Sequence, residues 1–295
     1  MRDLIALALT SHALGENIIR KAVWKDIKSH AASGDPDALL EWAQKNLSPS
    51  DAEQISERLA LLNDAEAYTI ELAQIGITTI TEFSDTYPTR YIEKLKGAHP
   101  AVLFVTGNLQ LLREPLIGIV GSRDVDDEGS AFAENLASEA AKIGYGVVSG
   151  GARGVDKISM RAAYEAGAPS VGILADSLQR TAISADTQDA IESGRVCLMT
   201  PFSPTAGFSV GNAMGRNKLI YALSDATVIV AATEGSGGTW AGAIEALEKN
   251  LCPVLVRPES EGSNALIAKG AVNLPAPSQL GPTIESATPT QGTLL

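Results

Sequence analysis

Short apolar runs alternate with amphipathic helical segments between Pro115 and Arg257. The runs cover residues 116–120, 146–148, 170–174, 196–199, 226–232 and 253–256. Helix candidates such as 128–142 and 155–167 lie between them, with apolar residues repeating four positions apart. Strands that are apolar throughout are buried on both faces, so we expect a parallel sheet with helices above and below it. The pattern predicts an α/β fold with a doubly wound, Rossmann-like, mostly parallel sheet.

The regions on either side of this pattern have different character. Residues 1–75 show helical periodicity, with loop-and-cap sequences at 33–36 and 48–51, and predict a small helical N-terminal domain for partner contact or support. Residues 76–273 are the predicted Rossmann domain, with 76–114 as a connector packed on it that contains strand-like stretches at 77–81 and 101–105. Residues 274–295 contain four prolines and one charge, Glu285, and predict a disordered tail.

Composition narrows the possible functions. At 45% hydrophobic residues and a mean hydropathy of +0.07, the 295-residue chain can bury a sizeable core. Its net charge of −12, from 23 basic and 35 acidic residues, excludes a general polyanion binder, so an anion site must be a local basic pocket. No apolar stretch approaches the ~20 residues of a membrane-spanning helix. We therefore expect a cytoplasmic location and no membrane contact.

Glycine and basic residues recur in four segments that follow predicted strands or open predicted helices. The candidate residues are Gly121, Ser122 and Arg123; Gly150, Gly151 and Arg153; Arg216, Asn217 and Lys218; and Ser236 and Gly237. Parallel strands end at one edge of their sheet, and ligands bind in the crevice there. Glycine exposes backbone N–H groups, and arginine adds a fork of donors for phosphate oxygens. The four segments together predict a phosphate-binding site at this edge.

The other motifs and polar residues of the sequence do not indicate a functional site. The loops match neither a G-x-G-x-x-G nor a Walker A motif. His12, His30 and His99 lack metal spacing, and Cys197 and Cys252 lie in apolar runs where cysteine is usually a small hydrophobe. Ser209 lies in a G-x-S-x-G sequence that follows no strand and has no histidine partner between Pro115 and Arg257. We predict no catalytic residue, no metal and no cofactor.

A series of motifs in this order resembles the DprA/Smf family of bacterial DNA-processing and recombination-mediator proteins. The motifs are FSDTYP at 83–88, PAVLFVTGN at 100–108, IVGSR at 119–123, VSGGARGVD at 148–156, GRNKLI at 215–220, VAATEGSG at 230–237 and SNALIAKGA at 263–271. The resemblance covers about residues 76–272. It implies an extended Rossmann domain, dimers, single-stranded DNA held at the strand ends by the candidate residues above, and loading of a RecA-type recombinase during recombination or transformation.

The chain also departs from the family pattern. The stretch after the third predicted strand, residues 174–183, lacks the usual glycine turn and Tyr-Pro, and a C-terminal winged helix common in the family is absent from this sequence. We therefore keep two alternatives to a DNA-binding protein. One is a nucleotide-ligand sensor or a LOG-like phosphoribohydrolase, for which Gly235-Ser-Gly-Gly-Thr is a weak signal. The other is an assembly protein whose pocket is vestigial.

Overall fold

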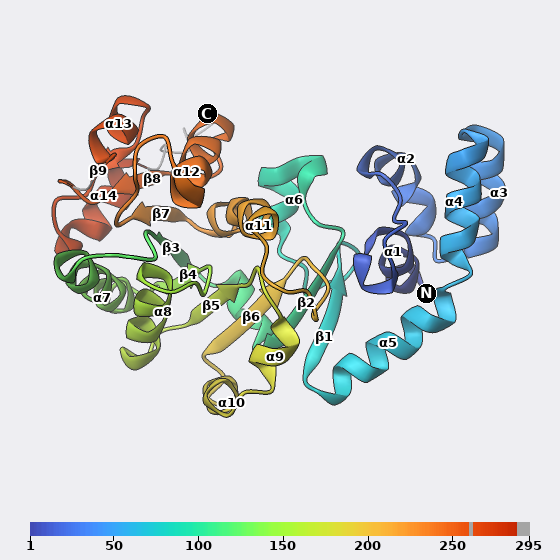
Figure 1. Ribbon diagram of the computed structural model, residues 1–295, viewed down its shortest axis with the longest axis horizontal. Coiled ribbons are helices and arrows are strands. Elements are labelled where there is room, and N and C mark those ends of the chain that lie inside the picture. Colours follow the sequence, from blue (N-terminus) through green and yellow to red (C-terminus); the bar gives the residue numbers. More distant parts are fainter. Residues whose placement is uncertain (260–261, 288–295) are drawn as a thin grey trace, which may run out of the picture.

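The computed structural model describes residues 1–259 and 262–287 (Figure 1). Within them, nine strands form a single sheet with the order β1-β2-β6-β5-β4-β3-β7-β8-β9. The strands are β1 (Ile77–Thr81), β2 (Val102–Gly107), β3 (Leu116–Val120), β4 (Gly146–Ser149), β5 (Ser170–Ile173), β6 (Val196–Thr200), β7 (Ala226–Ile229), β8 (Val254–Val256) and β9 (Val272–Asn273). Each of the six predicted apolar runs coincides with one of these strands to within a few residues.

The described helices begin with five α-helices before the sheet. They are α1 (Arg2–Thr10), α2 (Lys21–Ala31), α3 (Pro36–Asn46), α4 (Pro49–Leu59) and α5 (Leu62–Gln74). The later α-helices are α6 (Thr89–Leu95), α7 (Asp127–Lys142), α8 (Val155–Glu165), α9 (Leu178–Ala182), α10 (Ala185–Glu192), α11 (Val210–Leu223), α12 (Gly237–Lys249), α13 (Ser263–Ala268) and α14 (Leu280–Ala287). Short 3-10 helices are η1 (His12–Leu14), η2 (Lys96–Ala98), η3 (Leu109–Arg113) and η4 (Pro277–Gln279).

The two predicted loop-and-cap sequences do begin helices. Asp35 accepts hydrogen bonds from the backbone N–H groups of the first turn of α3, and Ser48 accepts one from Asp51 N at the start of α4. Each cap is followed by a proline, whose fixed φ suits the first helical position.

The sheet is mostly parallel, as predicted. Strands β3 to β9 pair in parallel with their neighbours, whereas β1 pairs antiparallel with β2 and β2 pairs antiparallel with β6, for example Val105 with Met199. The segment predicted as a connector therefore supplies two strands of the same sheet.

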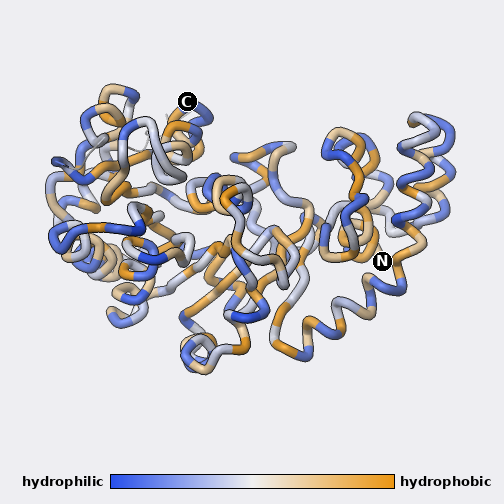
Figure 2. The backbone as a smooth tube through the Cα atoms, in the orientation of Figure 1, coloured by the Kyte–Doolittle hydropathy of each residue, from blue (hydrophilic) through white to orange (hydrophobic). Residues whose placement is uncertain are grey.

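Helices cover both faces of the sheet because its strands are apolar on both faces (Figures 1 and 2). On one face, Ile117 and Val228 pack against α7, α8 and α14 through residues such as Leu136. On the other face, Leu116 and Ile229 pack against α6, α11 and α12. The doubly wound α/β prediction is confirmed.

The five N-terminal helices share a core with the β1–β2 side of the sheet, where Leu7 and Ile27 cluster with Phe104. Arg58 stabilises their arrangement from inside, because its buried guanidinium donates to the carbonyl oxygens of Ala8, Ser11 and Leu14 at 2.6, 3.0 and 3.0 Å. The division of the chain into domains at residue 75 stays a prediction.

The C-terminal segment differs from the predicted disordered tail. Residues 277–287 form η4 and α14, and Leu280 and Ile284 are buried against α7. These two apolar residues are one helical turn apart, a spacing that the surrounding proline, serine and threonine residues obscured. Residues 288–295, which complete the predicted tail, lie outside the described residues. Among the described helices, none is both long and apolar enough to cross a membrane.

Candidate functional site

The strand order places a crevice at one edge of the sheet. From β3 the chain moves outward through β4, β5 and β6, and then returns to β7 on the other side of β3. In open α/β sheets, the carboxyl ends of the strands around such a reversal are where ligands bind. The loops that follow β3, β4, β5 and β6 meet there, and α11 packs across β3, β4 and β5 beside them.

These loops and α11 enclose a pocket of about 310 Å³, which we call the strand-end pocket. It is lined by Arg123, Gly150, Gly151, Ala152, Arg153, Lys157, Ala175, Asp176, Phe208 and Arg216. Five of the eleven predicted site residues therefore come together, and they include all three predicted arginines. Four cations and one carboxylate line the pocket, so it is a basic site in an acidic protein.

Arg216 is the most unusual side chain of the pocket. It is only 4% exposed, and within the described chain its Nε and Nη1 atoms are buried without a hydrogen-bond partner. Its guanidinium lies directly against the backbone of Gly150, where an added Cβ would be 1.5 Å from Nη1. Any side chain at position 150 would displace the guanidinium, so glycine is needed there for this close approach.

Asp156, in the first turn of α8, is the carboxylate whose charge has the largest effect on the pKa of Arg216. Burial raises the pKa of Asp156 above its ordinary value, although the charge of Arg216 and a 3.4 Å hydrogen bond from Ala152 N oppose the shift. Burial lowers the pKa of Arg216. The charge of Asp156 opposes this decrease, and the nearby charge of Arg123 adds to it. No ion pair within 4 Å joins Arg216 and Asp156, so the guanidinium keeps unsatisfied donors.

Arg123 lies at the mouth of the pocket in contact with an aromatic ring. Its guanidinium carbon is 4.8 Å from the ring centroid of Phe208, which comes from the loop before α11 and is 52% exposed. Such a contact orients the guanidinium at modest energy, and it leaves the planar group and the ring available to a ligand.

Arg153 also lies at the mouth, where it pairs with Asp124 at 2.6 Å. Both side chains are largely exposed, at 74% and 81%, so the pair contributes little to stability and can exchange for a stronger anion. The pair joins the loop after β3 to the loop after β4.

The remaining six predicted residues do not line the strand-end pocket. Gly121 and Ser122 pack against the start of α8, Asn217 Nδ2 donates to Gly238 O at 2.9 Å, and Lys218 faces a different cavity. Ser236 and Gly237 begin α12 after β7. These residues support or flank the loops, and the predicted fourth wall is absent from this pocket.

A family model described as DNA recombination-mediator protein A matches residues 78–282. The chain belongs to this family. The DNA processing protein DprA of Bacillus subtilis is 28% identical over 258 residues, which are 80% of this chain and 86% of that protein. Protein Smf of Escherichia coli is 27% identical over 205 residues, which are 67% of this chain and 54% of that protein.

Solved DprA structures share the fold. The X-ray structure of DprA from Streptococcus pneumoniae aligns over 95% of both chains with a TM-score of 0.69 and 20% identity. A DprA structure from Helicobacter pylori, reported for its single-stranded DNA binding mode, aligns over 71% of this chain and 96% of that one, with a TM-score of 0.60 and 26% identity.

Five lining residues of this DprA family member were not predicted from the sequence, and two of them, Lys157 and Phe208, could contact a ligand strand. Lys157 lies in the first turn of α8, directly after the glycine-rich loop, and a lysine at that position was a readable signal for an anion site. Phe208 lies inside the G-x-S-x-G sequence that follows no strand. In the structure, Ser209 of that sequence caps α11 by accepting from Asn212 N at 3.0 Å, and its neighbour Phe208 points its ring toward Arg123.

Both cysteines are buried in the core, in agreement with their apolar surroundings in the sequence. Burial raises the pKa of Cys197 to about 12 and that of Cys252 to about 11, so both are thiols at neutral pH. Among the described residues, no group of three or more His, Cys, Asp or Glu side chains is placed to hold a metal ion.

Proposed function

We propose that this protein binds single-stranded DNA through its phosphates in the strand-end pocket. The observation that carries the proposal is the buried guanidinium of Arg216, which belongs to the pocket lining and has two nitrogen atoms without a hydrogen-bond partner in the described chain. A phosphate oxygen in the pocket is the kind of partner that such a group lacks. The relation to the Helicobacter pylori protein supports single-stranded DNA as the source of that phosphate.

The pocket suits a strand held by its backbone. Arg123, Arg153 and Lys157 offer charge-assisted hydrogen bonds at the mouth, while Phe208 offers one exposed ring for a base. A single ring allows little base discrimination, so binding has weak sequence preference. With about two to four phosphates neutralised per protomer, log K falls with log salt at roughly −0.7 per phosphate.

The wider role follows from the family. We propose that the protein acts as a binding protein rather than an enzyme, forms homodimers, and hands its strand to a RecA-type recombinase in the cytoplasm. Dimerisation would double the number of phosphate contacts and offset the net charge of −12 by avidity. Affinity purification of the recombinase with the full-length protein, with and without DNA, tests the partner.

Arg123→Ala is expected to weaken binding of a labelled 30-nucleotide oligonucleotide by about tenfold, because a charge-assisted phosphate contact and its aromatic support are worth ~1.5 kcal/mol. Arg123 is at the pocket mouth and makes no buried hydrogen bond in the described chain, so the protein should fold normally. Fluorescence anisotropy at fixed salt measures the change.

Arg161→Ala is the matched control, since Arg161 is an exposed arginine on α8 that pairs with Glu165 outside the pocket. Equal affinities of Arg123→Ala and Arg161→Ala would reject the pocket assignment. A thermal shift with mononucleotides but none with the oligonucleotide would favour the nucleotide sensor or phosphoribohydrolase instead.

A further inference from the structure

A second cavity, of about 300 Å³, lies between the N-terminal helices and the sheet domain. It is bounded by α2, by the segment 97–102 that leads into β2, by residues 201–202, and by α11. We call it the α2–α11 pocket. Its wall is largely apolar, with Ile18, Trp24, Phe202 and Leu219 among its lining residues. A cavity of this size and character suits part of an organic ligand.

Three lysines of this pocket have no acidic partner. Lys21 and Lys25 extend from one face of α2, and Lys218 extends from α11. In the described part of the chain, no carboxylate lies within 4 Å of any of their ammonium groups. Burial lowers the pKa of Lys218, the charges of Lys21 and Lys249 lower it further, and that of Glu245 opposes the shift, so the ammonium groups of Lys21 and Lys218 lie close enough to repel each other. Repulsion of this kind is relieved by a bound anion.

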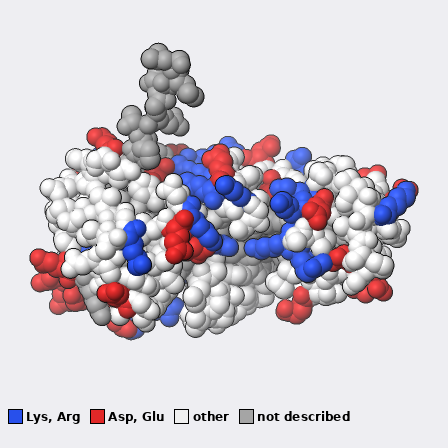
Figure 3. Space-filling model, turned by 90° about the horizontal axis from the view of Figure 1, so that it is seen from above, with Lys and Arg blue, Asp and Glu red and all other residues white. Residues whose placement is uncertain are grey.

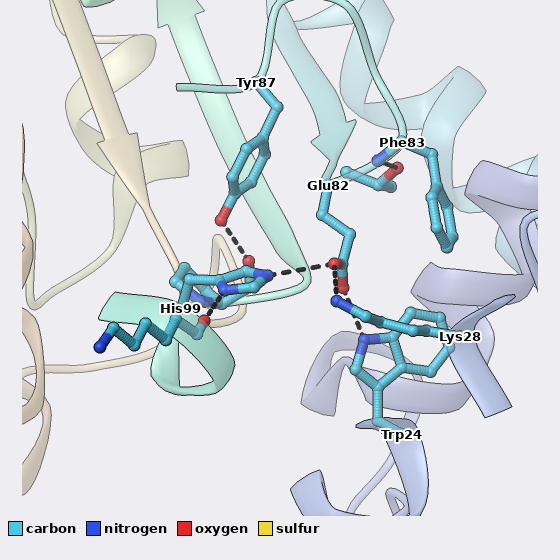
Figure 4. A network of polar contacts seen from close by, with 9 residues as sticks. Trp24, Lys28, Glu82, Phe83, Tyr87 and His99 are labelled. Carbon is cyan, nitrogen blue, oxygen red and sulfur yellow. Dashed lines mark hydrogen bonds and ion pairs between the residues drawn. The ribbon is translucent and has the colours of Figure 1, made fainter. Parts of the chain in front are cut away.

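Among the described residues, Glu82 is the one carboxylate that lines the pocket, and its negative charge is compensated by its own hydrogen-bond partners (Figure 4). Glu82 accepts from Trp24 Nε1 at 2.6 Å and from Lys28 Nζ at 3.3 Å, and it contacts His99 Nε2 at 3.1 Å. Burial raises the pKa of Glu82, but these hydrogen bonds and the charges of His99 and Lys28 outweigh burial and lower it. Glu82 therefore anchors Trp24 and Lys28 and does not compensate the other three lysines.

The α2–α11 pocket is distinct from the strand-end pocket. The two share no lining residue. Arg216 lines one and Lys218 the other, and residues two apart on an α-helix point about 200° apart, so α11 separates the two pockets. Figure 3 shows many Lys and Arg side chains across the middle of the face seen from above, with acidic side chains among them as well as toward the margins.

We propose that the α2–α11 pocket is a second binding site, for a nucleotide unit whose phosphate lies among Lys21, Lys25 and Lys218 and whose base lies on the apolar wall. Free phosphate would contact the lysines and leave the apolar wall uncovered, whereas a nucleotide contacts both. The unit can come from a strand that also occupies the strand-end pocket, in which case the site rests on the proposed function, or from a free nucleotide, in which case it does not.

The test uses full-length Lys21→Gln/Lys25→Gln, in which both altered side chains are exposed on α2. Its control is Lys45→Gln/Lys142→Gln, which changes the net charge equally at exposed positions outside both pockets. Binding of a labelled 30-nucleotide oligonucleotide is measured over a salt series. Binding of deoxyadenosine monophosphate is measured by calorimetry, on these proteins and on Arg123→Ala/Arg153→Ala.

If the strand supplies the nucleotide, Lys21→Gln/Lys25→Gln binds the oligonucleotide about fivefold more weakly than its control, and the magnitude of its salt slope falls by roughly 0.7, the share of one phosphate. If a free nucleotide is the ligand, the monophosphate binds to Arg123→Ala/Arg153→Ala and not to Lys21→Gln/Lys25→Gln. Identical behaviour of the two lysine pairs toward both probes overturns the second site. Failure of the wild type to bind the oligonucleotide rejects the proposed function, and the monophosphate then decides the second site alone.

Discussion

Replacing Arg216 by methionine is expected to weaken oligonucleotide binding by about 10- to 100-fold without lowering the free energy of unfolding at pH 5. The binding loss follows from the hydrogen bonds of a buried guanidinium to a phosphate, which are worth ~1.5–3 kcal/mol, and each ~1.4 kcal/mol is tenfold in affinity. The effect exceeds that of Arg123→Ala because Arg216 is 4% exposed, so water screens its charge far less.

The free energy of unfolding at pH 5 should be unchanged or higher because Arg216 is costly in the unbound protein. Its Nε and Nη1 atoms are desolvated without partners in the described chain, and methionine fills a similar space with no donor to satisfy. A residue whose removal weakens binding and spares the fold is one retained for function. Anisotropy titration and urea unfolding measure the two quantities on the same sample.

The effect on stability should depend on pH through Asp156. Burial already raises the pKa of this carboxyl, and loss of the Arg216 charge raises it further. An acid whose pKa is raised on folding costs stability as the pH rises from the unfolded value through the folded one. The free energy of unfolding of Arg216→Met, relative to that of wild type, is therefore expected to be higher at pH 5 than at pH 8. Unfolding of Arg161→Met at both pH values provides the control, since Arg161 is exposed. A loss of stability above ~2 kcal/mol in Arg216→Met would mark Arg216 as a structural group.

The sequence predicted the parts of the fold that depend on local pattern. The apolar runs located β3 to β8, because strands buried on both faces need no polar position and are recognisable from a few residues. It missed that β1 and β2 join the sheet, because this depends on the antiparallel pairing of β2 with β6, whose contacts are about 90 residues apart in the chain, such as Val105 with Met199. Periodicity carries no information on such pairing.

The same difference between local pattern and tertiary contact explains which site residues could be predicted from the sequence. Arg123, Arg153 and Arg216 were found because each follows a strand or lies on a helix at the same sheet edge. Lys218 was placed with Arg216 because the two are neighbours in sequence, yet two positions on a helix reverse the side-chain direction. Phe208 was missed because the path of the loop before α11 depends on tertiary packing. The α2–α11 pocket is lined by residues about 190 positions apart in the chain, for example Lys25 and Lys218, so no local motif predicts it.

Gly154→Ala is expected to lower the free energy of unfolding by ~3 kcal/mol, the sum of a disfavoured backbone conformation and a steric clash. Gly154 has φ +82° and ψ −135°, a conformation that residues with a Cβ rarely adopt. An added Cβ would lie 2.4 Å from Ser122 O and 2.7 Å from Arg123 O. These are backbone atoms, so relief requires the loop after β3 to move. Urea unfolding with linear extrapolation measures the loss.

Gly144→Ala separates the two causes. Gly144 has nearly the same φ, +83°, but nothing lies within 4 Å of the position of an added Cβ. Its substitution is expected to cost only ~1 kcal/mol, through backbone conformation alone. The difference between the two variants is then the cost of separating the loop after β3 from the loop after β4, together with the cost of the ψ of −135° at Gly154. Because these loops carry Arg123 and Arg153, Gly154→Ala should also bind the oligonucleotide about tenfold more weakly at a temperature where it is fully folded. Equal stabilities of the two variants, or wild-type affinity in Gly154→Ala, would show that the contact between the loops does not position the arginines.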